Sequence, residues 1–238
     1  MTRAELSYAL AAAMANILGA VAVTSRTRWT LRAHDATLSF AAGFMVSVAI
    51  ADLLPEAIAV GGASAATVAL VGYLLVHLTQ HTLARHFHFG EETHEVSEVV
   101  SVSALIGLLL HTFVDGVAVA SSVRVSPTLG ALVFVAVLLH KFPEGLAISS
   151  LFLAAGAGRA RALLAAASLG GATILGVLLT DVVPALSSNG LALAAGVTLY
   201  VGASNLVPEF QSKGGWRNPA SFFVGCGVYF LARQLAGH

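Results

Sequence analysis

Two short segments of this chain each carry a histidine and a carboxylate four residues apart. The first reads His111-Thr-Phe-Val-Asp115-Gly and the second reads His140-Lys-Phe-Pro-Glu144-Gly. On an α-helix this spacing places both side chains on one face. Two imidazoles and two carboxylates form a ligand set for a divalent transition metal ion. The alternative is that each pair is a structural ion or hydrogen-bond pair, and the repetition of the pattern favours the metal site.

The composition is that of an integral membrane protein. The 238 residues are 57% hydrophobic and 10% charged, and the mean hydropathy is +0.86, whereas soluble domains carry roughly 25% charged residues. A net charge of zero argues against a nucleic-acid partner. A single cysteine, Cys226, excludes a disulfide framework. Both motifs lie in apolar runs, where an unpaired charge costs about 2.5–3.5 kcal/mol on insertion scales, so a function is expected for them.

Eight apolar runs are long enough to cross a hydrocarbon core of roughly 30 Å. They lie at 5–25, 36–59, 63–84, 98–122, 127–154, 162–182, 190–210 and 219–236. We therefore predict an all-α membrane protein with eight transmembrane helices in a single domain, residues 1–238. Arginine and lysine gather in the loops after the odd-numbered runs. The positive-inside rule then predicts that both termini lie outside and that loop 85–97 is cytoplasmic. The excess of arginine over lysine is typical of a bacterial protein, which indicates an inner membrane.

A short motif recurs in inverted orientation in the two halves of the chain. The first copy and the second, 153 residues later, read Ala41-Ala-Gly43 with Asp52-Leu-Leu-Pro55-Glu56, and Ala194-Ala-Gly196 with Asn205-Leu-Val-Pro208-Glu209. This predicts a 3+2+3 arrangement, with a first repeat at 1–84, a central pair at 98–154 and an inverted repeat at 162–238. Inverted repeats are typical of secondary transporters, whose substrate site lies near the membrane midplane.

Lys141 is an unusual residue for a membrane span. It follows His140 directly, so it points about 100° away from it on a helix. Because its depth disfavours full snorkelling, we expect it to pair with Asp115 or Glu144 across the helix interface.

Further polar residues lie near the ends of the predicted spans. The loop 85–97 carries His86, His88 and His94 among acidic residues, which fits either a solvated loop or a low-affinity segment that collects metal. Three carboxylates lie at helix ends, where they are solvated at the interface or line the path of the metal: Asp52, Glu56 and Glu209.

The two central motifs, the eight runs and the Pro-Glu pairs near the ends of the second and seventh runs resemble the ZIP family of divalent metal transporters, particularly its bacterial branches. That family typically shows HNxxD/EG in its fourth span and a related motif ending in PEG in its fifth. The resemblance implies that the transport-site ligands are His111, Asp115, His140 and Glu144. It also implies a helix bundle, often a homodimer, that moves metal toward the cytoplasm and is not an enzyme. No resident cofactor is expected. Zinc is the first candidate for the cargo, and Fe²⁺, Mn²⁺, Co²⁺ and Cd²⁺ suit the same ligands.

Departures from the family pattern concern a second metal ion, which some members bind. Thr112 and Lys141 stand where many members carry Asn and a polar or acidic residue. The sixth span shows no carboxylate before Asp181, and Asn205 stands near a position that is commonly acidic in the seventh. We therefore predict a mononuclear site that Thr112 and Lys141 modulate.

Two other functions fit parts of this pattern. A membrane-embedded zinc hydrolase needs a metal with an open position and an activated water. Four protein ligands leave little room for that water, and a third histidine is absent from the spans near the other two. A channel with histidine–carboxylate relays is the second alternative.

Overall fold

The structure is a computed structural model of the chain and describes residues 2–25, 31–82, 98–208 and 215–235. Its regular elements are α1 (Arg3–Thr24), α2 (Leu31–Val48), the π-helical segment η1 (Ala49–Leu53), α3 (Leu54–Gly61), α4 (Ala63–Thr82), α5 (Glu98–Val125), α6 (Pro127–Ala154), α7 (Arg159–Val182), α8 (Pro184–Leu199), the π-helical segment η2 (Tyr200–Leu206) and α10 (Arg217–Leu235). All regular elements among the described residues are helices, which confirms the all-α prediction. The histidines of loop 85–97 lie outside the described residues.

Six of the described segments are long and apolar enough to cross a membrane. They are Arg3–Thr24, Leu38–Gly61, Ser101–Val125, Pro127–Ala154, Arg159–Val182 and Pro184–Leu206. The apolar part of α4 is shorter, Ala63–Thr79. Large apolar side chains such as Leu18 and Phe223 are 54% and 71% exposed, as expected for surfaces that face lipid.

Local sequence explains where several helices begin. Thr2 and Glu5 form a capping box at the start of α1. Ser126 accepts a hydrogen bond from the backbone of Leu129, and Pro127 occupies the first turn of α6. Ser126 is the one residue between α5 and α6. The two helices that carry the central motifs are therefore antiparallel neighbours.

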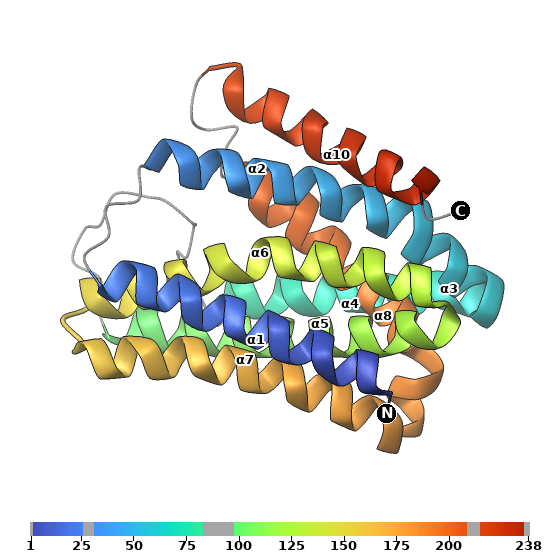
Figure 1. The fold of residues 1–238 in the computed structure, drawn as a ribbon. Coiled ribbons are helices and arrows are strands. Elements are labelled where there is room, and N and C mark those ends of the chain that lie inside the picture. The colour runs from blue at the N-terminus through green and yellow to red at the C-terminus, as the bar shows by residue number, and fades with distance from the viewer. Residues whose placement is uncertain (1, 26–30, 83–97, 209–214, 236–238) are drawn as a thin grey trace.

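Four pairs of helices that run in the same direction cross at reciprocal glycines (Figure 1). The pairs are Gly19 of α1 with Gly145 of α6, Gly116 of α5 with Gly176 of α7, Gly43 of α2 with Gly225 of α10, and Gly72 of α4 with Gly196 of α8. A Cβ atom on Gly145 would lie 2.0 Å from the carbonyl oxygen of Asn16, and one on Gly116 would lie 2.0 Å from that of Thr173. Only glycine permits this backbone contact, the packing that small residues give in membranes.

These crossings arrange the helices around the centre of the bundle. α2 and α10 lie side by side along one side of the molecule, α1 and α7 lie on the opposite side, and α6 lies between them (Figure 1). α4 packs on α8, and α5 contacts α6, α7 and α8. The two central helices are therefore covered by neighbours from both halves of the chain.

Both π-helical segments lie just before a proline. η1 precedes Pro55 and contains Asp52, and η2 precedes Pro208 and contains Asn205. Proline donates no backbone hydrogen bond, so the helical ladder must be rearranged in the preceding turn. Such π-bulges are frequent at functional sites.

Candidate metal centre

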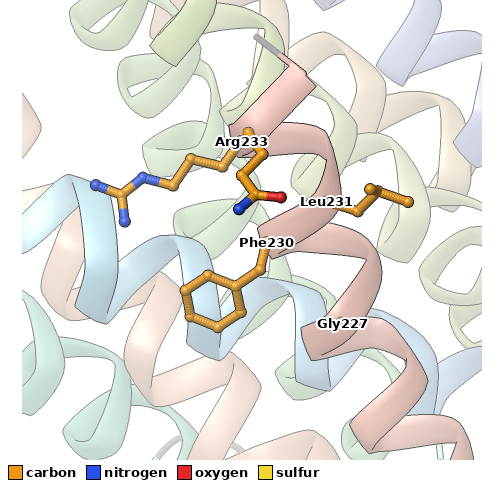
Figure 2. A pocket seen from close by; sticks show the side chains of 5 residues that line it. Gly227, Phe230, Leu231 and Arg233 are labelled. Atoms are coloured by element: carbon orange, nitrogen blue, oxygen red, sulfur yellow. The ribbon is translucent and has the colours of Figure 1, made fainter. Parts of the chain in front are cut away.

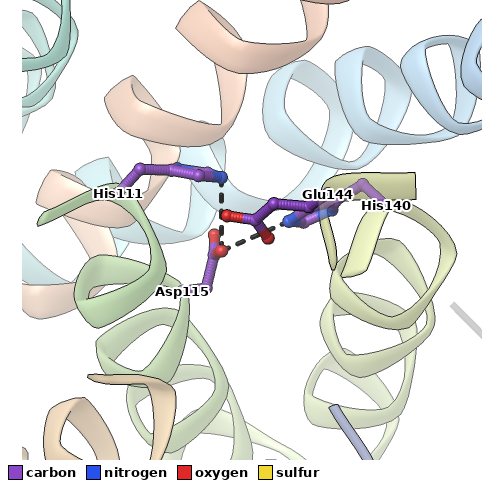
Figure 3. Close-up of side chains that lie close together, drawn as sticks. All are labelled: His111, Asp115, His140 and Glu144. Carbon is purple, nitrogen blue, oxygen red and sulfur yellow. Dashed lines mark hydrogen bonds and ion pairs between the residues drawn. The ribbon is translucent and has the colours of Figure 1, made fainter. Parts of the chain in front are cut away.

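The four side chains of the central motifs meet halfway along α5 and α6 (Figure 3). His111 and Asp115 lie one turn apart on α5, and His140 and Glu144 lie one turn apart on α6. Each of the four is at most 4% exposed. One ligand atom from each lies within 4.8 Å of the others. We call these four residues the tetrad.

One oxygen of Asp115 is the meeting point of both imidazoles. Its Oδ2 lies 3.3 Å from Nε2 of His111 and 3.2 Å from Nε2 of His140 (Figure 3). The Nδ1 of His140 lies 2.9 Å from the carbonyl oxygen of Ala136. A metal-ligating histidine donates its other ring N–H to such a carbonyl, so Nε2 is the atom of His140 that can ligate an ion, in place of its present contact with Asp115. The Nδ1 of His111 is buried without a hydrogen-bond partner among the described residues.

Lys141 joins the two carboxylates of the tetrad. Its Nζ lies 2.6 Å from Oδ2 of Asp115 and 2.6 Å from Oε2 of Glu144, and the side chain is fully buried. The expected pairing across the helix interface is confirmed for Asp115 of α5, and Glu144, three residues further along α6, is a second partner. Such a buried ammonium is tolerated because two negative charges offset its desolvation.

Thr112 contacts the second oxygen of Glu144. The fully buried hydroxyl, with one proton to donate, lies between two acceptors: the carbonyl oxygen of Leu108 and Oε1 of Glu144, which is 3.1 Å away. Glu144 thus contacts Lys141 at one oxygen and Thr112 at the other. The two residues that depart from the family pattern are therefore the ones that fix this carboxylate.

A cavity of about 20 Å³ adjoins the tetrad. It is lined by His111, His140 and Glu144 on one side and by Asn205 of η2 on another, and its remaining walls are apolar: Leu38, Leu108, Val201 and Leu206. About one water-sized sphere fills such a volume. The sequence analysis considered Asn205 only for a second metal ion, and the structure places it in the wall of the cavity beside the tetrad.

Other polar residues lie away from the tetrad. Asp52 and Glu56 line a separate cavity of about 410 Å³ that no tetrad residue lines. Asp181 pairs with Arg124 at 2.5 Å. Asn16, which sequence reasoning missed, is fully buried at the crossing with Gly145, and its side-chain amide has no hydrogen-bond partner among the described residues. Glu209 lies outside the described residues.

The spacing of the tetrad suits a small divalent ion. Ligands that surround zinc tetrahedrally at about 2.0–2.2 Å lie about 3.3–3.6 Å from one another. The measured separations of 3.2 and 3.3 Å between the imidazoles and Asp115 are close to this range. The centre therefore needs little rearrangement of those three side chains to hold such an ion.

The chain matches the model of a known protein family. Residues 90–232, more than half of the chain, match the family described as ZIP Zinc transporter. The matched segment contains both central motifs, Lys141 and Asn205. None of the curated proteins compared with the chain matches it.

Proposed function

Since the chain belongs to the ZIP zinc transporter family, we propose that it carries a divalent transition metal ion, zinc in the first place, across the membrane to the cytoplasm. Divalent metal transport follows from the family, and so does the absence of an enzymatic role. Membership therefore sets aside the zinc hydrolase considered from the sequence.

The tetrad is the proposed transport site, with His111, Asp115, His140 and Glu144 as the ligands of the cargo. The observation that carries this assignment is the convergence of four buried ligand atoms within 4.8 Å. The two carboxylates attract a divalent ion, with one of their negative charges offset by Lys141, and two imidazoles suit its preference for nitrogen ligands. Fe²⁺, Mn²⁺, Co²⁺ and Cd²⁺ fit the same donors.

A single ion per site is the second part of the proposal. The ammonium of Lys141 lies between Asp115 and Glu144. Its positive charge occupies the position where a second metal ion would bind these carboxylates. Two unit charges 4 Å apart repel by about 4 kcal/mol at an effective dielectric of 20, and a divalent ion doubles this. Lys141 therefore favours a mononuclear site.

The proposed architecture has eight transmembrane helices in one domain, arranged 3+2+3. The glycine crossings follow this symmetry. If each helix is replaced by its counterpart in the other half (α1 by α7, α2 by α8, α4 by α10, and α5 by α6), the crossing of α1 with α6 becomes that of α7 with α5, and the crossing of α2 with α10 becomes that of α8 with α4. Two of the exchanged positions, Gly43 with Gly196 and Gly72 with Gly225, keep the offset of 153 seen in the sequence motif. α4 packs along α8 and α10 packs along α2. These contacts favour α4 and α10 as further transmembrane helices at the same depth as α8 and α2. These features support repeats at 1–84 and 162–238 around a central pair at 98–154, with loop 85–97 as an accessory segment.

The cavity beside the tetrad supports release toward the cytoplasm. Its lining includes Leu108, three residues before His111 on the side of α5 that leads to Glu98, and Leu206 at the end of η2. Both places lie toward the end of the bundle where loop 85–97 joins α5. The distribution of arginine and lysine favours a cytoplasmic location for that end, with both termini outside. A bacterial inner membrane and a homodimer complete the proposal, the latter from the family resemblance.

Uptake into proteoliposomes tests the proposal. Purified protein is reconstituted and offered Zn²⁺, Fe²⁺, Mn²⁺, Co²⁺ and Cd²⁺ in turn. We expect zinc uptake that His111→Ala and Glu144→Ala nearly abolish, because each removes a ligand of the ion. Arg161→Gln is the matched control, since Arg161 is 69% exposed in a surface pair with Glu98. Normal uptake in both ligand variants would reject the tetrad as the transport site. A lipid-hydrolysis assay on the same preparations should remain negative.

A further inference from the structure

The cavity lined by Asp52 and Glu56, which we call the outer cavity, is separated from the tetrad. It lies where α5 turns into α6, and its lining includes Ser126, Leu129 and Arg233. Leu129 precedes His140 by eleven residues, which is about 16 Å along a helix. The intervening stretch of α6 carries buried apolar side chains: Leu132, Val133, Ala136 and Val137. The tetrad adjoins the cavity lined by Asn205, and the outer cavity shares no lining residue with that cavity.

Both carboxylate oxygens of Asp52 contact α10. The hydroxyl of Tyr229 donates to Oδ2 at 2.6 Å, and Nε of Arg233 forms an ion pair with Oδ1 at 3.1 Å that lacks hydrogen-bond geometry. The side chain of Asp52 is 10% exposed and that of Arg233 is 34% exposed. Arg233 also lines a pocket on the outer face of α10, and its guanidinium points toward the neighbouring helix (Figure 2). A cation of the protein thus covers a carboxylate at the edge of water.

The sequence repeat relates Asp52 to a residue beside the tetrad. Asp52 matches Asn205 in the repeated motif, and both lie in π-helical segments. Asn205 lines the cavity that adjoins the tetrad, and Asp52 lines the cavity at the opposite end. The two residues therefore occupy equivalent positions on the two sides of the transport site, and the outer one carries the negative charge.

We propose that Arg233 sets the apparent affinity of the transporter for the incoming ion by competing with it for the carboxylate of Asp52. A divalent cation that reaches the outer cavity meets Asp52 before it can reach the tetrad. The guanidinium is always protonated, so Asp52 is neutralised as long as Arg233 holds it. A partly exposed ion pair is weak, which lets an arriving ion displace the arginine. This inference rests on the proposed transport function.

The initial rate of zinc uptake, measured against external zinc concentration in proteoliposomes, tests the competition. Arg233→Gln should lower the KM about two- to fivefold, the scale of a partly exposed ion pair. Asp52→Asn should raise the KM, because the carboxylate itself is lost. Arg233→Lys keeps the charge and should stay nearest to the wild type. Opposite shifts in the first two variants are the signature of competition.

A purely structural tie between α10 and η1 gives a different result. Losing either partner would then change the uptake in the same direction, and this outcome overturns the proposal, as does an unchanged KM in Arg233→Gln. Arg233→Met, which keeps the apolar stem of the side chain, serves as a second neutral variant if the glutamine variant does not fold. Arg161→Gln again controls for the loss of a surface charge. Absence of uptake in the wild type would instead reject the proposed function.

Discussion

Replacing Lys141 by methionine separates the two roles that the structure gives to its ammonium. The Nζ atom lies 2.6 Å from an oxygen of each of two buried carboxylates, Asp115 and Glu144. Breaking a buried ion pair by removing one partner costs about 3–5 kcal/mol, because the other charge is left uncompensated. The metal-free variant should lose stability by this amount.

The same replacement should strengthen zinc binding. A divalent ion near the ammonium feels a repulsion of about 8 kcal/mol at 4 Å and an effective dielectric of 20. Relief of even a fifth of that repulsion tightens binding by about tenfold, which corresponds to 1.4 kcal/mol. Lys141→Met is therefore expected to be less stable than the wild type without zinc and to bind zinc more tightly.

Unfolding of the purified protein, with and without zinc, measures the first effect, and a competition titration measures the second. Arg161→Met is the control, since its partner Glu98 is 74% exposed, and an exposed pair contributes at most about 1 kcal/mol. Unchanged zinc-free stability together with unchanged zinc affinity in Lys141→Met would refute the reasoning, because the ammonium would then neither compensate the carboxylates nor oppose the ion.

Three further predictions concern other parts of the molecule. Lys141→Asp combined with Thr112→Asn should admit a second ion. Elemental analysis at saturating zinc, in protein without the loop histidines, should then show the zinc content rising from one ion per chain toward two. Two ions per chain in the same protein without the two substitutions would contradict the mononuclear site. Gly145→Ala should abolish uptake and lower the free energy of unfolding by about 1–3 kcal/mol, because its Cβ would lie 2.0 Å from the carbonyl oxygen of Asn16. A Cβ on Gly107 would meet nothing within 4 Å, so Gly107→Ala should behave as wild type in the uptake and unfolding assays. Serine in place of His86, His88 and His94 should change the uptake rate only a few-fold, and complete loss in a well-expressed triple variant would make that loop an obligatory part of the path.

The helical architecture and the membership of the tetrad could be predicted from the sequence. Apolar runs of the right length specify membrane helices because lipid offers no partner for the backbone. A spacing of four residues places histidine and carboxylate on one helix face whatever surrounds the helix. One linking residue, Ser126, forces α5 and α6 together. These are local properties, so the sequence alone determines them.

Contacts between distant segments depended on the tertiary structure. Sequence reasoning expected Lys141 to pair with Asp115 or Glu144, and the structure joins it to both: Glu144 lies three residues further along the same helix, and the packing of α5 on α6 brings Asp115 to the same ammonium. Asn205 reaches the cavity of the tetrad from a segment 61 residues beyond Glu144. Periodicity within one helix carries no information on such distances.

The glycines at the helix crossings also depend partly on the sequence and partly on the tertiary structure. Gly116 and Gly145 follow the two carboxylates of the tetrad, Asp115 and Glu144, in the sequence. Their position indicates close packing but does not identify the helix that packs there. The structure shows that α7 and α1 press their backbones against these positions. A glycine allows close approach, and the helix that approaches is chosen by the packing of the whole bundle. The sequence by itself thus determined the helices and the donor atoms of the site, and the tertiary structure decided which charges and which backbones surround them.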